Sequence, residues 1–259
     1  MKVKEIANLI ENVAPVCYAS PWDNVGLNIG DLNAEVNKVM LTLDVTPSVV
    51  AQAIEENCEL IISHHPFIFD ELKSIDFNTP MGNMINLLVS NKMSVYSCHT
   101  NMDSADGGIN TNLARMFGLD NVVVLERNEK YENVGIGRVG KLKKSITAEE
   151  LVNETKTLLN TPFVRVVSNN LKDEIECLAV ASGSCGDLIA LAKEKGADAI
   201  ITADVKYHQA LEALDIGICV IDAGHFPTEN HVTDILKNLL QNTGLEIVLA
   251  KTKDCFQVI

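Results

Sequence analysis

Two stretches of this chain repeat one pattern of apolar and polar residues at a fixed distance. Residues 41–65 and 180–204 align without a gap at an offset of 139, so that His65 falls on Asp204. A helical pattern and a further apolar run follow each copy, which gives two β-α-β-α-β units. Buried strands are all rich in Ile, Val and Leu, so the alternative is that any two such units look alike. We interpret the pattern as a repeat and expect two related units.

Short apolar runs alternate with helical patterns along most of the chain, which is typical of α/β layers with a largely parallel sheet. At 259 residues the chain can form one large domain or two smaller ones. We predict two α/β domains, residues 1–125 and 126–259. Strands are expected at 38–44, 59–63, 94–98, 121–125, 134–141, 163–167, 176–182, 198–202, 218–222 and 246–250, the last as an edge strand of either domain. Helices are expected at 47–57, 81–91, 109–117, 147–160, 186–195, 205–215 and 228–241.

The charge of the chain argues against two classes of partner. Its net charge is −14, from 21 basic and 35 acidic side chains, and no run of Lys or Arg is longer than Lys143-Lys144. Nonspecific binding to nucleic acid or to an anionic membrane needs a positive surface. We therefore expect neither a nucleic acid nor a membrane as a partner.

The cysteines and the N-terminal segment indicate a cytoplasmic protein. The seven cysteines are odd in number, scattered, and never spaced C-x-x-C, as expected in a reducing compartment. Residues 1–15 have an amphipathic helical pattern instead of the continuous apolar stretch of a signal peptide. No apolar segment approaches the roughly 18 residues that a spanning helix needs.

Four of the six histidines lie in three short motifs, each directly after an apolar run. The motifs are Ser63–Pro66 (SHHP), Cys98–Asp103 (CHTNMD) and His225–Glu229 (HFPTE). Open α/β sheets bind ligands beyond the carboxyl ends of their strands, so we expect the motifs to meet in one cleft. Imidazoles and carboxylates gathered in this way are the usual ligands of a hydrolytic metal site.

His64 and His65 are adjacent, so in a regular strand their side chains would point to opposite faces. Pro66 stops the strand ladder, and both rings can face one cleft where the chain turns. The alternative is one core histidine and one surface histidine. We favour metal ligation for both because of the neighbouring motifs.

Asp103 ends a run that we expect to be extended, ahead of a Gly-Gly turn. Either Asp103 or Asp106 could instead cap the helix at 109–117, and Asp106 fits that role better. Asp103 is therefore the candidate ligand. His99 could be a ligand, a residue that orients a ligand, or a proton carrier.

His225 and Glu229 are four residues apart, with Pro227 between them where a helix is expected to begin. A carboxylate in the first turn of a helix is favoured without any metal, so Glu229 alone is a weak signal. Two cations close together need anions between them, and Glu229 could supply one. Three imidazoles and two carboxylates suit Zn²⁺, Fe or Mn²⁺ better than Mg²⁺ or Ca²⁺.

Other features carry less information. The turn Ser182–Gly186 could hold an anion or be a plain tight turn, and Cys185 within it could act as a nucleophile. Asp204 and His208 could line the cleft or stabilise a helix start. Trp22, the only tryptophan, could close over the cleft or be buried in a long loop.

Five motifs occur in the order WDNVGL, SHHP, CHTNMD, GRVG and GHFPTE, from near the N-terminus to residue 229. With these five motifs in this order, the chain resembles the NIF-three-like dinuclear metal centre family, whose bacterial members often carry the name GTP cyclohydrolase I type 2 homologue. The resemblance implies two interlocked α/β domains, a two-metal site in the cleft between them, and a toroidal homohexamer. Carried over residue by residue, it implies as metal ligands His64, His65, Asp103, His225 and Glu229.

The resemblance also has departures. Family members often have Gly where this chain has Ala203, and Cys185 stands in a turn that is usually rich in Gly. Longer members insert a further domain in mid-chain, whereas this chain resembles a short form.

These patterns favour a dinuclear metal-dependent hydrolase of a nucleotide-like substrate, with two divalent ions per chain and His99 or His208 moving protons. The nucleotide rests on the resemblance alone. In its cyclohydrolase version, activated water attacks C8 of guanine and formate is released. The alternative is a non-catalytic metal-binding hexamer that acts as a scaffold, an adaptor or a metal-handling protein.

Overall fold

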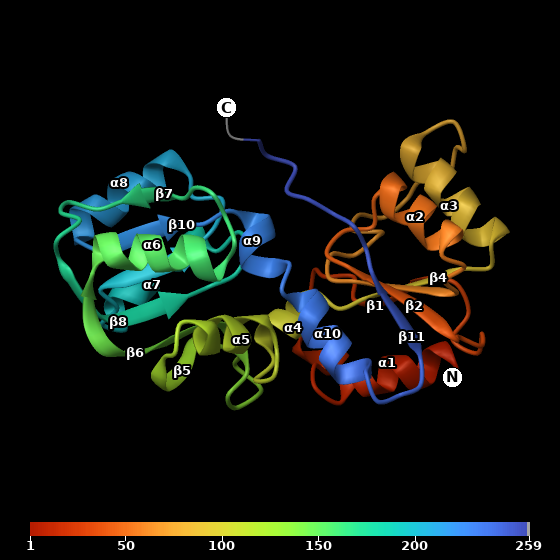
Figure 1. The fold of residues 1–259 in the computed structure, drawn as a ribbon, viewed down its shortest axis with the longest axis horizontal. Helices are drawn as coiled ribbons and strands as arrows, with labels where there is room; N and C mark the ends of the chain where they lie inside the picture. Colours follow the sequence, from red (N-terminus) through yellow and green to blue (C-terminus); the bar gives the residue numbers. More distant parts are fainter. Residues whose placement is uncertain (258–259) are drawn as a thin grey trace. The chain divides into compact units, whose positions relative to one another are not determined.

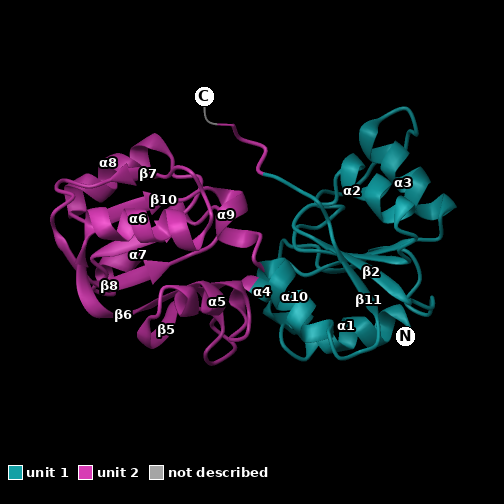
Figure 2. Ribbon diagram, in the orientation of Figure 1, with its two compact units in different colours: residues 1–102, 232–253 teal, residues 103–231, 254–259 magenta. Residues whose placement is uncertain are grey.

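The computed structural model describes residues 1–257 of the chain. They form an α/β protein with two compact units, each with its own sheet. Unit 1 consists of Met1–Met102 and Val232–Lys253, and unit 2 consists of Asp103–His231 with the chain from Asp254 onward (Figure 2). Residues 103–231 of unit 2 are therefore inserted between the two parts of unit 1.

The sheet of unit 1 has the strand order β1-β4-β3-β2-β11. Four of its strands are parallel, β2 (Lys38–Thr42), β3 (Leu60–Ser63), β4 (Ser94–Ser97) and β11 (Glu246–Leu249), and β1 (Gly26–Ile29) is antiparallel to β4. The strands β3 (LIIS) and β4 (SVYS) are buried along their whole length, and β3 is almost continuously apolar, as expected of a strand covered on both faces.

Helices cover both faces of this sheet (Figure 1). The helices are α1 (Val3–Glu11), α2 (Pro47–Glu55), α3 (Pro80–Ser90) and α10 (Val232–Leu240), with a 3₁₀ turn η1 (Val16–Tyr18). The apolar core on the α2 and α3 side includes Met40, Ile61 and Leu88. Helix α4 (Thr100–Ser104) carries the chain across the boundary between the units.

The sheet of unit 2 has the strand order β5-β6-β8-β9-β10-β7. Its parallel strands are β8 (Glu174–Val180), β9 (Ala199–Thr202) and β10 (Cys219–Asp222), and its antiparallel strands are β5 (Asp120–Arg127), β6 (Gly135–Thr147) and β7 (Arg165–Val167). The helices are α5 (Ile109–Met116), α6 (Ala148–Leu158), α7 (Ile189–Glu194), α8 (Tyr207–Ile216) and α9 (His225–Glu229), with a 3₁₀ turn η2 (Gly186–Leu188). One apolar core lies under α5 and α6 and a second under α7 and α8.

The predicted repeat is present in the register of the two sheets. Leu41 pairs with Ile62 in unit 1, and Val180 pairs with Ile201 in unit 2, which are the same positions at the offset of 139. The third parallel strand follows next to the second in both units, and an antiparallel strand then pairs with it. The two units are therefore built on one β-α-β-α-β plan.

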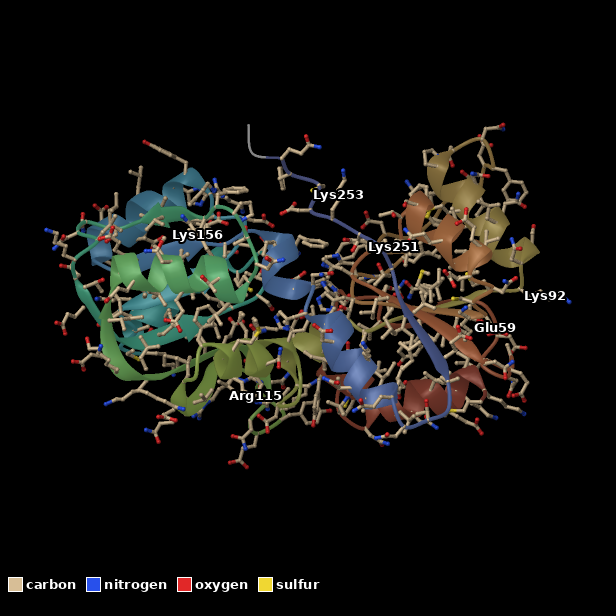
Figure 3. The ribbon with its side chains drawn as sticks, viewed as in Figure 1. Glu59, Lys92, Arg115, Lys156, Lys251 and Lys253 are labelled. Atoms are coloured by element: carbon tan, nitrogen blue, oxygen red, sulfur yellow. The ribbon has the colours of Figure 1, made fainter. Side chains whose placement is uncertain are left out.

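Local side chains fix where several helices and strands begin. Thr46 and Thr79 each accept a hydrogen bond from an amide three residues ahead, and a proline follows both at the first helical position. Thr147 and Glu150 form a capping box at the start of α6. Glu59, labelled in Figure 3, accepts hydrogen bonds from the amides of residues 37 and 38 and so fixes the start of β2 beside β3.

The domain boundary differs from the prediction. The units divide after Met102 instead of after residue 125, and residues 232–253 return to unit 1. The physical reason is pairing: β5 joins β6 in the second sheet, whereas β11 joins β2 in the first. The apolar run at 246–250 is thus an edge strand of the first unit.

Three local predictions also differ. Residues 100–104 form a helix instead of an extended run, because the Asp23 carboxylate accepts a hydrogen bond from the amide of Thr100. The helix expected at 228–241 is two helices, α9 and α10. Strand β1 was not predicted because it is short, half-buried and at the sheet edge. Among residues 1–257, none of the helices is both long enough and apolar enough to cross a membrane.

Candidate metal centre

Unit 1 brings together the three histidines of its two motifs. His64 and His65 directly follow β3, and His99 follows β4, the neighbouring parallel strand. One ring nitrogen from each lies within 4.8 Å of the other two. Both rings of the His64-His65 pair lie close to His99, with centroids 5.1 and 5.5 Å from it; His64 is fully buried and the side chain of His65 is 24% exposed.

Each of these imidazoles makes a hydrogen bond through Nδ1 to an oxygen. His64 Nδ1 lies 2.8 Å from the carbonyl oxygen of Cys98, His65 Nδ1 lies 2.7 Å from Asp44 Oδ1, and His99 Nδ1 lies 2.9 Å from Asp23 Oδ1. An oxygen acceptor at Nδ1 requires that nitrogen to carry the hydrogen, which places the lone pair of a neutral ring on Nε2. Metal-binding histidines in proteins have this arrangement, in which a carboxylate or carbonyl fixes the ring.

Asp23 joins the WDNVGL segment to the CHTNMD motif. Its side chain is fully buried, and it accepts hydrogen bonds from His99 and from the amide and hydroxyl of Thr100. Burial acts to raise the pKa of Asp23, but these hydrogen bonds and the His99 charge outweigh it and hold the pKa below the usual value. Asp23 is therefore an ionised carboxylate that both caps α4 and orients His99.

Unit 2 brings together His225 and Glu229 at the two ends of α9. His225 Nε2 lies 2.9 Å from Glu229 Oε2, and His225 Nδ1 lies 2.7 Å from Asp204 Oδ2. Glu229 is the last residue of α9, where the helix dipole disfavours a carboxylate, and it is only 4% exposed. The helix-dipole explanation considered for Glu229 therefore does not apply. Two ligand atoms bound to one ion at about 2.0–2.2 Å lie about 3 Å apart, so this pair fits a shared ion.

Gly183 makes room for this pair. Its backbone has φ +64°, and a Cβ at this position would lie 2.0 Å from Glu229 Oε1 and 3.3 Å from His225 Nε2. The Gly183 amide donates to Thr228 Oγ1 and so fixes the turn against α9. A side chain here would occupy the space of a ligand atom, and only glycine keeps that space open.

Asp103 is held by polar contacts within unit 2. It is buried, and Ser182 Oγ lies 3.4 Å from its Oδ1. Asn110 donates to the Asp103 carbonyl and accepts from the Ser182 amide, so one side chain ties α4 to the turn after β8. Asp106, by contrast, is exposed, and the residue at the N-cap of α5 is Gly108.

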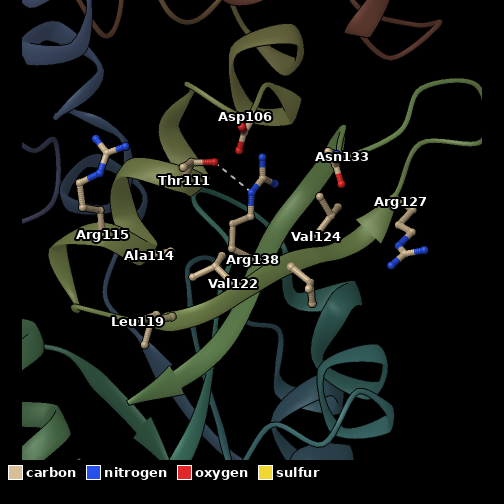
Figure 4. A pocket seen from close by; sticks show the side chains of 11 residues that line it. Asp106, Thr111, Ala114, Arg115, Leu119, Val122, Val124, Arg127, Asn133 and Arg138 are labelled. Carbon is tan, nitrogen blue, oxygen red and sulfur yellow. Dashed lines mark hydrogen bonds between the residues drawn. The ribbon is translucent and has the colours of Figure 1, made fainter. Parts of the chain in front are cut away.

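Arg138 of the GRVG motif fixes the chain that follows Asp103. It is 2% exposed and its Nη2 donates to the carbonyls of Ser104 and Ala105. Its Nε donates to Thr111 Oγ1, the contact drawn in Figure 4. The guanidinium lines a pocket of about 360 Å³ that Arg115 and Arg127 also line.

Three weaker sequence candidates are now placed. Burial raises the pKa of the Cys185 thiol strongly, and the negative charges of Asp103 and Glu229 act in the same direction, so a thiolate nucleophile is disfavoured. Three amides of the turn Ser182–Gly186 donate to protein oxygens, which argues against the anion site. His208 is exposed on α8, and Asp204 binds His225 instead.

Sequence reasoning did not find two of the three carboxylates that bind the histidines through Nδ1, Asp23 and Asp44, whereas Asp204 was among its candidates. Asp44 lies just after β2, in the same position relative to its strand as the ligands, and that was the available signal. Asp23 lies in a recognised motif, but its partner His99 is 76 residues away in the chain.

Comparisons with known proteins relate the whole chain to one family. The model of the family described as Duf34/NIF3 (NGG1p interacting factor 3) matches residues 1–255. A Clostridium acetobutylicum protein named GTP cyclohydrolase 1 type 2 homolog is 40% identical over 230 residues, covering 88% of this chain and 85% of the relative. A Clostridium perfringens protein of the same name is 36% identical, with 100% of both chains covered. The crystal structure of a Bacillus cereus protein related to NIF3 matches with a TM-score of 0.91 at 25% identity, over 100% of this chain and 99% of that chain.

Proposed function

This chain belongs to the Duf34/NIF3 family, and from that premise we propose that it is a metal-dependent hydrolase of a nucleotide-like substrate. The proposal assigns the ligands of both units to one centre with two divalent ions, Zn²⁺, Fe or Mn²⁺. The ligands are His64, His65, Asp103, His225 and Glu229. The name GTP cyclohydrolase 1 type 2 homolog, carried by relatives, motivates the nucleotide.

The observation that most supports the proposal is the hydrogen bonding of the candidate ligand histidines. All three candidate ligand imidazoles make an Nδ1 hydrogen bond to an oxygen, and for His65 and His225 that oxygen belongs to a carboxylate. A carboxylate at Nδ1 fixes the tautomer, orients the ring and makes Nε2 a better donor to a cation. A histidine in a core also needs an acceptor for its ring N–H, but that acceptor does not have to be a carboxylate.

The chemistry divides between the ions and the chain. Bound divalent ions lower the pKa of water and polarise the substrate bond under attack. Asp44 and Asp204 hold the rings of His65 and His225 in place, and Gly183 leaves the space that Glu229 occupies. His99, fixed by the ionised Asp23, either completes the ligand set or moves a proton.

Metal analysis tests the centre before any substrate is known. We expect about two ions per chain in the purified parent and clear losses in Asp103→Asn and Glu229→Gln. Glu212→Gln, an exposed carboxylate on α8, is the matched control and should keep the metal of the parent. Metal-loaded protein is then offered GTP, other nucleotides and simple phosphoesters. If both ligand variants kept the metal content of the parent, the ligand assignment would be wrong.

Turnover distinguishes the hydrolase from a metal-binding scaffold or adaptor. Hydrolysis of one of these substrates, lost in Glu229→Gln and kept in Glu212→Gln, supports the enzyme. Full metal content without turnover supports the scaffold, a role in keeping with a yeast relative named NGG1-interacting factor 3. We also propose a homohexamer, as in the resemblance, for which light scattering should give six times the mass of the chain.

A further inference from the structure

Two exposed aromatic side chains stand beside the histidine cluster of unit 1. Trp22 is 62% exposed and Phe69 is 54% exposed, although both rings are large and apolar. Their centroids lie 5.9 Å apart, and they lie 6.0 and 6.4 Å from the centroid of His99. The three rings are tilted against one another by 53° to 71°, so they form a corner with His99 at one side.

The backbone beneath these two rings is held in place. Ile68, which precedes Phe69, donates its amide to Asn28 Oδ1 and accepts from Asn24 Nδ2 at its carbonyl. Asp23, which follows Trp22, is the buried carboxylate that binds His99 and Thr100. Both aromatic residues therefore lie next to anchored residues, while their rings stay in contact with water.

We infer that Trp22 and Phe69 form the binding surface for a planar heteroaromatic ring of the substrate. This inference rests on the proposed function and narrows its substrate class to compounds with such a ring, a nucleobase or a pterin. The ring would lie against the two aromatic side chains, and its edge would face His99 and the neighbouring imidazoles. Trp22 and Phe69 are specificity-determining residues in this assignment and take no part in the chemical step.

Stacking chemistry favours a planar ring over an aliphatic ligand. An aromatic ligand gains quadrupole interactions with other rings in addition to the apolar area that it buries. Stacking on an aromatic side chain also depends little on which base is bound, because every base has a π-face. Hydrolytic attack on such a ring needs an electrophilic ring carbon near activated water. His99 lies beside both Trp22 and Phe69 and also belongs to the histidine cluster, so a ring bound to the two aromatic side chains would lie next to that cluster.

The chain carries its own reporter for this test, since Trp22 is its only tryptophan. The fluorescence of Trp22 is recorded while metal-loaded full-length protein is titrated with GMP, AMP, CMP or pterin. Ribose 5-phosphate, which has the sugar and phosphate without a ring, is titrated in parallel. We expect saturable quenching by at least one ring compound and none by ribose 5-phosphate.

Phe69→Leu keeps the reporter and should weaken binding of the quenching compound about tenfold or more. Phe77→Leu is the matched control, because Phe77 lies in the same loop, is 58% exposed and is outside the corner. Metal content is measured in both variants and should equal that of the parent. Trp22→Leu removes the reporter, so its binding is measured by equilibrium dialysis and should fall as in Phe69→Leu.

The outcomes separate this inference from the hydrolase proposal. Saturable, Phe69-dependent binding without turnover supports the aromatic surface and counts against the hydrolase. Turnover of a substrate without a ring, unchanged in Phe69→Leu, supports the hydrolase and overturns the aromatic surface. Absence of quenching by every ring compound, or equal affinities in Phe69→Leu and Phe77→Leu, also overturns it.

Discussion

Replacing Arg138 with methionine removes all five N–H donors of a guanidinium group that is buried in unit 2. Nε donates to Thr111 Oγ1 at 3.0 Å. Each Nη nitrogen donates to two carbonyls at 2.8 to 3.3 Å, those of Gly135 and Gly137 and those of Ser104 and Ala105. Methionine fills part of the volume but leaves these oxygens without the donor.

The expected loss of unfolding free energy is about 3–5 kcal/mol. Each buried polar group left unsatisfied costs about 1–3 kcal/mol, so the five oxygens together set an upper limit well above this range. Removing the guanidinium also removes a desolvation cost of several kcal/mol. That cost is visible in the direction of the pKa of Arg138, which burial lowers while the charge of Asp106 acts the other way. The net value is the cost of the five oxygens left without a donor, less the desolvation cost that is relieved.

The assay is urea-induced unfolding of metal-free protein, followed by far-ultraviolet circular dichroism. Arg115→Met is the control, because Arg115 lines the same pocket (Figures 3 and 4) but is exposed, and it should change stability by about 0.5 kcal/mol or less. Arg138→Lys should recover part of the loss, because an ammonium offers three donors. A loss below about 1 kcal/mol for Arg138→Met would refute the reasoning that its hydrogen bonds hold this unit together.

Three further predictions follow from the candidate centre and the cysteines. Gly183→Ala should abolish metal retention in elemental analysis, because its Cβ would lie 2.0 Å from Glu229 Oε1; unchanged metal would contradict this. Asp44→Asn should weaken metal binding about 10- to 100-fold, as measured in competition with a chelating dye, because Asp44 orients the ring of His65. Equal metal affinity in the variant and the parent would exclude this role of Asp44. Burial raises the pKa of Cys58 to about 11, so at pH 9 it stays a thiol, and we expect iodoacetamide to alkylate the exposed Cys17 before the buried Cys58, as read by mass spectrometry. Equal alkylation rates at pH 9 would count against that ordering.

The parallel strands and the motifs that follow them could be predicted because their signals are local. A buried parallel strand is a continuous apolar run, and a polar motif directly after it lies at the carboxyl edge of the sheet. The same reasoning gave His64, His65 and His99, which the structure places within 4.8 Å. The repeat was also visible, because corresponding strands keep the same register and so the same residues on the buried faces.

What could not be predicted depends on pairs that lie far apart in the chain. Nothing local ties Asp23 to His99, yet their contact both orients a histidine and turns residues 100–104 into a helix. The prediction of the domain boundary was wrong for a related reason. A single apolar run such as β11 carries no mark of the sheet that it will join, so its return to β2 was left open.

The insertion of unit 2 into unit 1 has a consequence for synthesis on the ribosome. Residues 1–102 emerge first, but β11, which completes their sheet beside β2, ends at Leu249, after the whole of the inserted segment. At about 5–20 residues per second, the nascent first unit waits roughly 8–30 s for its last strand. During that time the edge of β2 is an open template for other strands. Unit 2 has all its strands within 103–231 and can complete its sheet during the same interval. Chaperone demand in vivo should therefore fall on the unit that is made first.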